Sequence, residues 1–472
     1  MAFKKITHKS AIIICVSHGF HVRNIIFSKL YAHLAENFRV VLLLPTCSEV
    51  PNSDMALLRG ATIVPAVISK HRFENAILFL RKNVFAGRER TQTFNLINEF
   101  DRLRHPWVYR IASAFNAVLG RIPAVARAWQ HLESLIIPGH EFDALLERER
   151  PCMVLSANYG TEAMEVRLLR ASHRHGIPTM AIVPSWDNLS SKGIIGENPR
   201  HLVVWNEIMR DEARRLYGFP DKAVYVCGGL QFDPYAGSES DERRDEIFDR
   251  VGIDARHPYV VLGTITPRYF PKNVEVLDIL IENAEKGRLP ANLQIVVRLH
   301  PQVVDDPHFG DNLDEYRERA ARWTRVKLSI PRVLRWGTLR PPHHDDGTEL
   351  AVLLRHAAAA VMPASTLAID ACALGSPVIG IGFDGLERKP YSQSVRRTFD
   401  FTHYRRIVQE GGLRIAESPD EMVEMVVRYM QDRQLDADGR RRIVDSHIFK
   451  LDGKAWERIA QVVSDVHLRA AP

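Results

Sequence analysis

The sequence predicts an α/β protein with two Rossmann-like halves, and three observations support this prediction. Short β-rich runs alternate with longer stretches of helical pattern along much of the 472 residues. The runs are apolar almost throughout, which is typical of parallel strands that are covered by helices on both faces. A charged segment, "SESDERRDEIFDRVGIDARH" (238–257), separates two series of such runs and is read as the connection between two domains.

The first series places strands at 11–17, 39–45, 61–67, 152–158, 179–185, 201–206 and 223–229. Between about 70 and 148 the pattern changes to long, amphipathic, Arg-rich helical sequence without clear strands. This segment is predicted to be a helical insertion in an N-terminal domain of residues 1–240. Packing against that domain is its simplest role, and contact with a membrane or an acceptor is the alternative.

The second series consists of the runs 259–266, 293–301, 357–366 and 377–383, and predicts a C-terminal domain of residues 241–450. Two such domains would face a cleft, and ligands of open α/β sheets bind at the carboxyl ends of the strands. No repeat relates the two halves.

Composition excludes several classes of protein. The chain is 46% hydrophobic and 25% charged, as expected of a globular protein, and its net charge of +6 favours an anionic substrate or surface only weakly. Five cysteines without a CxxC pair predict neither a disulfide framework nor a zinc site, and they fit a reducing cytoplasm. The apolar run near the start is too short for a membrane span. No aromatic-interleaved basic stripe indicates nucleic-acid binding.

Polar residues follow several predicted strands. In "VVLGTITPRYF" the strand breaks at Gly263 and leaves Thr264, Thr266 and Arg268 at its carboxyl end. Hydroxyl and guanidinium groups bind phosphate oxygens, and turn chemistry explains the same residues equally well.

The strand "QIVVRLHP" ends in Arg298 and His300, and Pro301 fixes the chain direction directly afterwards. The imidazole of His300 is therefore held at the strand end, where it can donate a hydrogen bond to a diphosphate or a ribose. A histidine that only packs in the core is the alternative.

In "AAAAVMPASTLAIDACALGSPVIGI", Ser365 and Thr366 follow a buried strand and open a helix whose first N–H groups suit a phosphate. Asp370 lies one helical turn beyond Thr366, close enough to orient a hydroxyl or the substrate. The alternative is an ordinary N-cap at Ser365 and a solvated Asp370.

From about 180 to 385 the sequence resembles the CDP-glycerol glycerophosphotransferases of teichoic acid synthesis and, more broadly, GT-B glycosyltransferases and capsule-polysaccharide transferases. Those polymerases have a Trp-His-Gly segment with a following lysine, a Gly-x-Pro-Arg-x-Asp element, a strand ending in Leu-His-Pro, and an Asp-Tyr-Ser-Ser element with a following aspartate and Gly-x-Pro. The corresponding stretches here are "PSWDNLSSKG", "GGLQFD", "RLHP" and "PASTLAIDACALGSPVIG". The resemblance implies a GT-B-like fold, in which a terminal helix at 451–472 packs back on the N-terminal domain.

The resemblance also implies roles for residues of the C-terminal domain. Bacterial sialyltransferases share a similar His-Pro and Ser-Ser/Thr pair, which contacts the cytidine nucleotide and its phosphate. By this analogy His300, Ser365 and Thr366 hold the nucleotide diphosphate, and Asp370 supports them. Asp384 in "GFDGLERKP" occupies a loop that often approaches the donor sugar in GT-B enzymes, although a plain turn explains it too.

The catalytic base departs from the polymerase pattern. The histidine of Trp-His-Gly corresponds here to Asp187, whose carboxylate can take a proton from an acceptor hydroxyl or only cap a turn. Trp186, Asn188 and Lys192 accompany Asp187 as candidates for contact with the acceptor or a phosphate. Because that histidine is replaced, sugar transfer explains the sequence better than phosphoglycerol transfer.

The loop "SHGFHVRNI" after the first strand offers His18 and His21 as rival bases, because this loop faces the acceptor in GT-B enzymes. Both histidines could instead pack the loop. The G-x-G-x-x-G fingerprint is absent from this turn, so a nicotinamide cofactor is not expected.

No metal and no cofactor are predicted. "HHDDGTEL" (343–350) contains adjacent His343, His344, Asp345 and Asp346, but neighbouring side chains converge on one ion only in a special loop. The stretch is therefore interpreted as a polar turn before a helix. GT-B transfer usually needs no bound metal, because helix dipoles and basic groups stabilise the leaving diphosphate.

Together these observations predict a cytoplasmic glycosyltransferase that moves a sugar from a nucleotide-linked donor to a surface-polysaccharide or glycoconjugate acceptor. Peripheral attachment to the inner face of the membrane is the alternative to a freely diffusing protein. Its partners would be a nucleotide-sugar and a glycan or lipid-linked acceptor. The alternatives are a CDP-glycerol-type glycerophosphotransferase, a UDP-sugar 2-epimerase and a non-catalytic nucleotide-binding relative.

Overall fold

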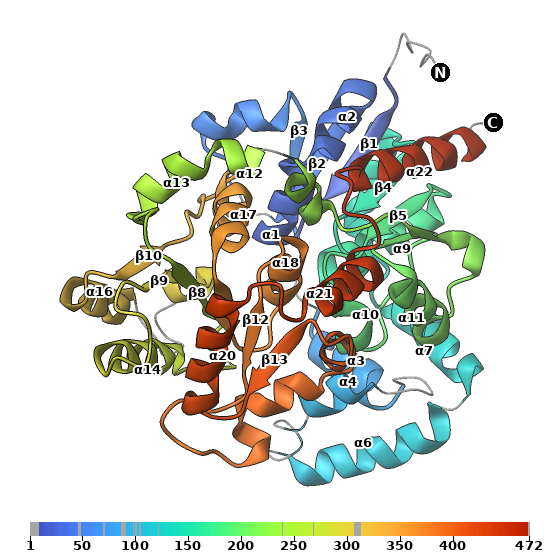
Figure 1. Ribbon diagram of the computed structural model, residues 1–472. Helices are drawn as coiled ribbons and strands as arrows, with labels where there is room; N and C mark the ends of the chain where they lie inside the picture. Colours follow the sequence, from blue (N-terminus) through green and yellow to red (C-terminus); the bar gives the residue numbers. More distant parts are fainter. Residues whose placement is uncertain are drawn as a thin grey trace. The chain divides into compact units, whose positions relative to one another are not determined.

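The computed structural model describes residues 9–45, 49–68, 71–85, 91–97, 99, 102, 105–120, 122–237, 239–267, 269–305 and 313–470. The chain forms two compact units, which Figure 1 shows with their elements labelled. Unit 1 comprises Met1–Gln231, Leu334–Pro341 and Lys454–Pro472, and unit 2 comprises Phe232–Val333 and Pro342–Gly453. Neither unit is a single continuous stretch of sequence.

Unit 1 has a seven-stranded sheet among its described residues, in the order β3-β2-β1-β4-β5-β6-β7, and every pair in it is parallel. The order reverses between β1 and β4, which makes the carboxyl ends of these two strands the expected ligand site. The strands are β1 (Ala11–Cys15), β2 (Arg39–Pro45), β3 (Thr62–Ala66), β4 (Met153–Ser156), β5 (Thr179–Ile182), β6 (His201–Val204) and β7 (Val224–Val226).

Helices cover both faces of this sheet, as the continuous apolar strands predict. Along β1, Ile12 and Ile14 join a core with residues of α2 and α22, whereas Ile13 and Cys15 join a core with residues of α8 and α9. The covering helices are α2 (Lys29–Asn37), α8 (Asp143–Glu149), α9 (Ala163–Arg174), α11 (Glu207–Tyr217) and the C-terminal α22 (Ala455–Ala470).

The predicted insertion between β3 and β4 is helical throughout its described elements. These are α3 (Glu74–Asn83), α4 (Gln92–Ile97), α6 (Pro106–Leu119) and α7 (Pro123–Ile136), which α8 follows. Pro106 and Pro123 stand in the first turns of α6 and α7, where the missing N–H group costs no hydrogen bond.

Unit 2 has a six-stranded parallel sheet among its described residues, in the order β10-β9-β8-β11-β12-β13. Its switch point lies between β8 and β11. The strands are β8 (Tyr259–Gly263), β9 (Gln294–Arg298), β10 (Val326–Ser329), β11 (Ala359–Met362), β12 (Val378–Ile381) and β13 (Leu413–Ala416). The helices of eight or more residues are α13 (Arg244–Val251), α14 (Asn273–Glu285), α16 (Leu313–Arg322), α17 (Asp346–His356), α19 (Thr402–Gln409) and α20 (Pro419–Gln431).

Two features of unit 2 differ from the sequence analysis. The charged segment 238–257 is not merely a connection, because it contains α13, from which Arg250 binds Glu349 of α17 at 2.9 Å. The segment Leu334–Pro341 leaves unit 2 and contributes to unit 1, where Trp336 is fully buried and its indole N–H donates to Asp54 at 2.8 Å.

None of the described helices combines the length and the hydropathy that crossing a bilayer requires.

Candidate functional site

The first cluster of functional groups lies at the carboxyl ends of β1 and β4. His18 follows β1 and Glu162 follows β4, and the His18 Nε2 atom lies 3.5 Å from Glu162 Oε1. The hydrogen bond to Glu162 raises the pKa of His18, and the same contact lowers the pKa of Glu162. The charge of Lys192, beyond β5, lowers the pKa of both groups. His18 is exposed, so a substrate can reach its imidazole.

A buried group of three residues lies beneath this pair. The Ser17 hydroxyl donates to Glu165 Oε1 and lies 3.3 Å from His21 Nδ1. When Glu165 is ionised, Ser17 donates to it and His21 donates from Nδ1; when Glu165 is protonated, it can donate to Ser17, which then donates to His21 Nδ1. His21 Nε2 is buried and has no hydrogen-bond partner among the described residues.

Burial shifts the pKa values of Glu165 and His21 in the directions that favour the neutral forms of both side chains. Burial of Glu165, which is fully shielded from solvent, raises its pKa to about 7. Burial of His21 lowers its pKa to about 3. His21 is therefore neutral and inaccessible, which makes it a poor base for an acceptor hydroxyl, in contrast to the sequence-based expectation.

Local structure explains why these side chains meet. A π-helical turn, Val22–Ile26, follows the short helix α1 (Gly19–His21) directly after His18. A Cβ atom on Gly19 would overlap the backbone carbonyl of Arg340, so the close packing of segment 334–341 on this loop requires glycine. At the start of α9, Glu162 and Glu165 form a reciprocal capping box.

The Asp187 loop follows β5, the neighbour of β4. The Asp187 carboxylate accepts hydrogen bonds from the hydroxyls of Ser185 and Ser191, at 2.5 and 3.1 Å, before the short helix α10 (Asn188–Ser191). Trp186 and Asn188 are buried, and the Asn188 carbonyl accepts from the Tyr159 hydroxyl at 2.6 Å. The local turn role that the sequence allowed for Asp187 is thus present.

The second cluster lies in unit 2, at the carboxyl ends of β8, β9 and β11. The His300 N–H group donates to Thr264 Oγ1 at 2.8 Å, which ties the end of β9 to the end of β8. The Gln302 N–H group donates to His300 Nδ1 at 3.2 Å, so the neutral imidazole carries its proton on Nε2. Burial and the charge of Arg298 lower the pKa of His300 to about 4. His300 is therefore a neutral hydrogen-bond donor at the strand end.

Partly exposed hydroxyl groups accompany His300 at these strand ends. They belong to Thr266 after β8 and to Ser365 and Thr366 after β11, where α18 (Leu367–Ala373) begins. A Cβ atom on Gly263 would overlap the side chain of Leu367, so β8 approaches the start of α18 closely. Arg268 lies outside the described residues.

Three further candidates of unit 2 have internal partners. Asp370 is buried and accepts a hydrogen bond from the Tyr235 hydroxyl at 3.0 Å. Arg298 is also buried, and its guanidinium binds Asp346 at 2.6 Å and Glu349 at 3.3 Å. Asp384 Oδ1 accepts from the N–H of Val395 and Oδ2 from that of Lys389. We therefore assign Arg298 and Asp384 to the framework of unit 2 rather than to donor contacts.

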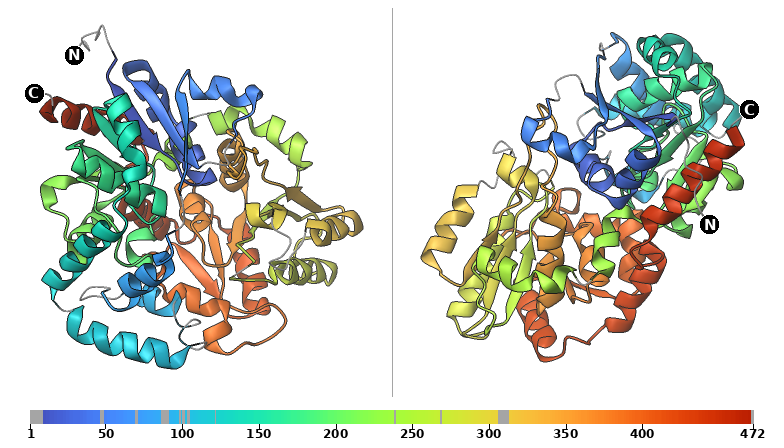
Figure 2. Two further views of the ribbon diagram at one scale, coloured as in Figure 1. Left: turned by 180° about the vertical axis from the view of Figure 1, so that it is seen from behind. Right: turned by 90° about the horizontal axis from the view of Figure 1, so that it is seen from above.

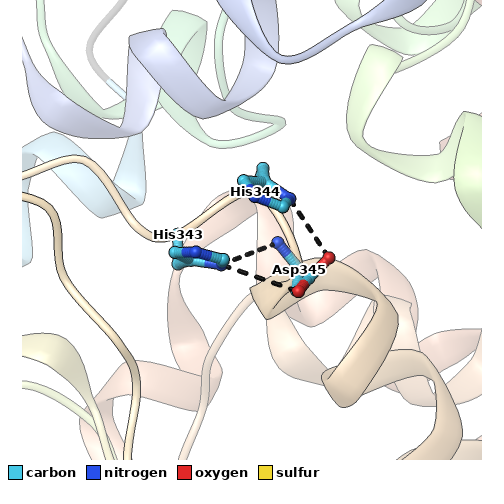
Figure 3. A group of neighbouring side chains, drawn as sticks. All are labelled: His343, His344 and Asp345. Carbon is cyan, nitrogen blue, oxygen red and sulfur yellow. Dashed lines mark hydrogen bonds and ion pairs between the residues drawn. The ribbon is translucent and has the colours of Figure 1, made fainter. Parts of the chain in front are cut away.

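The histidine-rich turn before α17 brings its side chains closer than the sequence analysis expected. Figure 3 shows both imidazoles beside Asp345, and ligand atoms of His343, His344 and Asp345 lie within 4.8 Å of one another. The Asp345 carboxylate is also bound by Arg243 at 3.1 Å and Arg332 at 3.3 Å. Because two guanidinium groups already compensate its charge, we interpret the cluster as an ion-paired turn.

Sequence reasoning missed Ser17, Glu162 and Glu165. The available signal was the stretch "GTEAMEV" after a predicted strand, in which two glutamates stand three residues apart at a helix start. The depth at which Glu165 is buried depends on tertiary packing and could not be read from that pattern.

Comparisons with known proteins show likeness in structure only. No protein-family model and no curated protein matches the sequence. The structure of MnaA from S. aureus with UDP is similar, with a TM-score of 0.55, 10% identity and coverage of 98% of each chain.

Two further structures show the same likeness. The UDP-GlcNAc 2-epimerase from Methanocaldococcus jannaschii has a TM-score of 0.53 and 13% identity, with 97% of this chain and 99% of that chain covered. The wall teichoic acid polymerase TagF, soaked with CDPG, has a TM-score of 0.51 and 10% identity, with 97% of this chain and 89% of that chain covered. The two parallel-sheet units together with these matches show that the protein has a GT-B-like fold.

Proposed function

We propose that the protein is a glycosyltransferase that uses a nucleotide-linked sugar donor. The observation that carries this proposal is the exposed His18–Glu162 pair above the buried Glu165, at the switch point of unit 1. An imidazole oriented by a carboxylate is a standard general base for a hydroxyl group. Of the similar structures described above, MnaA was solved with UDP, the protein from Methanocaldococcus jannaschii is a UDP-GlcNAc 2-epimerase, and TagF was soaked with CDPG, which supports a nucleotide-linked ligand.

In the proposed reaction, His18 takes the proton of the acceptor hydroxyl while its oxygen bonds to the anomeric carbon of the donor sugar. The bond from that carbon to the phosphate oxygen breaks, and the nucleotide leaves with the bonding electrons. Glu162 orients His18 and stabilises its protonated form, because their contact raises the pKa of the imidazole. Asp187 is the second candidate base, but its oxygens already accept two serine hydroxyls.

Unit 2 would bind the donor in this proposal. His300 would donate its Nε2 proton to a phosphate oxygen, and the hydroxyls of Thr266, Ser365 and Thr366 would donate to others. Thr264 positions His300 by accepting its backbone N–H. Lys192, whose charge acts on His18 and Glu162, would contact an anionic group of the acceptor, which we propose is a glycan or a lipid-linked sugar of a surface polysaccharide.

Donor binding is tested by calorimetric titration of CMP, CDP, UDP, GDP and TDP into the full chain and its His300→Ala variant. We expect selective binding of one nucleotide and at least a tenfold loss of affinity in the variant. His257→Ala is the matched control, because His257 is an exposed histidine of the same unit that precedes β8 rather than following a strand. Equal affinity in all three proteins would remove His300 from the site, and no binding of any nucleotide would favour a non-catalytic relative.

The reaction is tested with the nucleotide-sugar that corresponds to the bound nucleotide. Release of the nucleotide together with a glycosylated acceptor supports transfer, and we expect His18→Gln to lower turnover by about 10² to 10⁴ while the affinity for the nucleotide is retained. An epimerised sugar and free nucleotide, formed without acceptor, would instead show a UDP-sugar 2-epimerase. Transfer of phosphoglycerol from CDP-glycerol would show the polymerase-type reaction.

A further inference from the structure

The helices α6 and α7 of the insertion pack on unit 1 through one face only. On α6, Ala112 is buried and the ring of Tyr109 contacts that of Phe79 on α3, with their centroids 5.6 Å apart. Figures 1 and 2 show α6, in cyan, set apart from the strands of unit 1, with α3 beside it in Figure 1.

A buried ion-pair network holds α7 in place. Glu133 of α7 binds Arg81 of α3 at 3.0 Å and Arg170 of α9 at 2.8 Å. All three side chains are at most 5% exposed, and Glu197, 3.6 Å from Arg170, supplies the second carboxylate that balances the two arginines. The inner face of the insertion is therefore fixed to the folded domain.

The outer face of α6 carries an apolar stripe that no other part of the described chain shields from solvent. Its members are 51–71% exposed: Trp107, Val108, Ile111, Phe115 and Val118. At 100° per residue these five positions fall within an arc of about 100°, which is the width of a face normally packed against a core. Ile122 between the helices and Leu132, Leu135 and Ile136 of α7 are exposed as well.

The charged residues in the sequence segment that contains α6 are all basic. Residues 102–132 contain five arginines and two histidines but no aspartate or glutamate. Arg110 and Arg127 are exposed, and the Arg110 guanidinium lies 5.4 Å from the centroid of the Trp107 ring. An exposed apolar stripe on a segment whose charged residues, from 102 to 132, are all basic is complementary to a surface that is apolar inside and anionic outside.

We propose that the stripe formed by Trp107, Val108, Ile111, Phe115 and Val118 docks on an anionic lipid bilayer. The 14 residues of α6 extend about 21 Å and would lie in the plane of the interface, with the apolar stripe among the acyl chains. The arginines would reach the lipid phosphates, since their long stems let the charged ends extend to the headgroups. The proposal concerns a surface outside the two clusters described above and does not depend on the proposed function.

The test is flotation of the full chain with vesicles of phosphatidylcholine alone or of phosphatidylcholine with phosphatidylglycerol. We expect flotation with the anionic vesicles, and at least a tenfold weaker partition for the double variant Ile111→Ser and Phe115→Ser. The matched control, Ala114→Ser and Ala117→Ser, places the same new side chain on exposed positions of the same helix beside the stripe, and we expect less than a twofold change. Arg110→Gln should weaken binding about fivefold on anionic vesicles only.

Three results would overturn the proposal. One is the absence of flotation with either vesicle, and another is an equal loss in the stripe variant and its control. The third is self-association, detected by sedimentation velocity without lipid, that the stripe variant abolishes, because the stripe would then be an interface between copies of the chain. Far-UV circular dichroism and the urea midpoint of the stripe variant show whether the protein is folded, so that loss of flotation is not mistaken for unfolding.

Discussion

The buried carboxyl of Glu165 gives a prediction with a definite sign and size. Burial raises its pKa from 4.5 to about 7, so between these pH values the folded protein keeps a proton that the unfolded chain has released. The free energy of unfolding therefore falls as pH rises through this window. The shift of 2.5 pKa units corresponds to about 3 kcal/mol, all of it lost above pH 7.

Glu165→Gln keeps the shape of the side chain but cannot ionise. Its stability relative to the wild type should therefore increase by about 3 kcal/mol between pH 4.5 and pH 8. Urea unfolding of both proteins at these two pH values, followed by the tryptophan signal, measures the difference. Glu147→Gln, on the exposed surface of α8 in the same unit, is the control for the loss of one carboxyl group.

A difference between Glu165→Gln and the wild type that is the same at both pH values would refute the reasoning. Glu165 would then be ionised in the folded protein at low pH, and burial would not govern its titration. The same result would show that Glu165, beneath His18, is not half-protonated near pH 7.

Two further predictions concern the framework of unit 2. Arg298→Met should lower the stability of unit 2 by about 3–5 kcal/mol, because it leaves Asp346 buried without its cationic partner. Arg317→Met, the control at an exposed ion pair, should cost less than about 1 kcal/mol. Urea unfolding measures both losses, and equal losses would contradict the buried network. Asp384→Ala should leave the N–H groups of Lys389 and Val395 without their acceptor, which should lower the free energy of unfolding by about 1–3 kcal/mol and speed hydrogen exchange at these amides. Unchanged exchange would show that the carboxylate does not hold the loop.

Strands in the centre of both sheets were predictable because their burial on both faces leaves only apolar residues. The prediction of "RVVLLLP" coincides with β2. The strands β10 and β13 were missed, and both form edges of the unit 2 sheet. Each is four residues long and includes one charged residue, Lys327 or Arg414, which is how proteins keep exposed edges from pairing.

The position of a candidate residue was predictable where local sequence fixes it, as at a strand end. Its role was not predictable where that role depends on partners far away in the sequence. His300 stands at a strand end because proline follows it, and this pattern is visible in the sequence. Arg298 precedes it by two residues and is bound by carboxylates of α17, about fifty positions away in the chain. Sequence spacing does not show which side of the sheet such a partner covers. A guanidinium that binds carboxylates of the same protein could therefore not be distinguished from one that is available to a ligand.

The excursion of Leu334–Pro341 into unit 1, together with the return of the chain at Lys454, also constrains how the protein can be made. On the ribosome, the loop bearing His18 is synthesised well before Trp336, and Trp336 well before α22, although both complete the core beside that loop. Unit 1 would therefore stay incomplete until α22 has been translated, when both segments of unit 2 have already been synthesised. Cutting the gene at any single position would leave unit 1 without part of its interior, so separate halves would have to be co-expressed rather than studied alone.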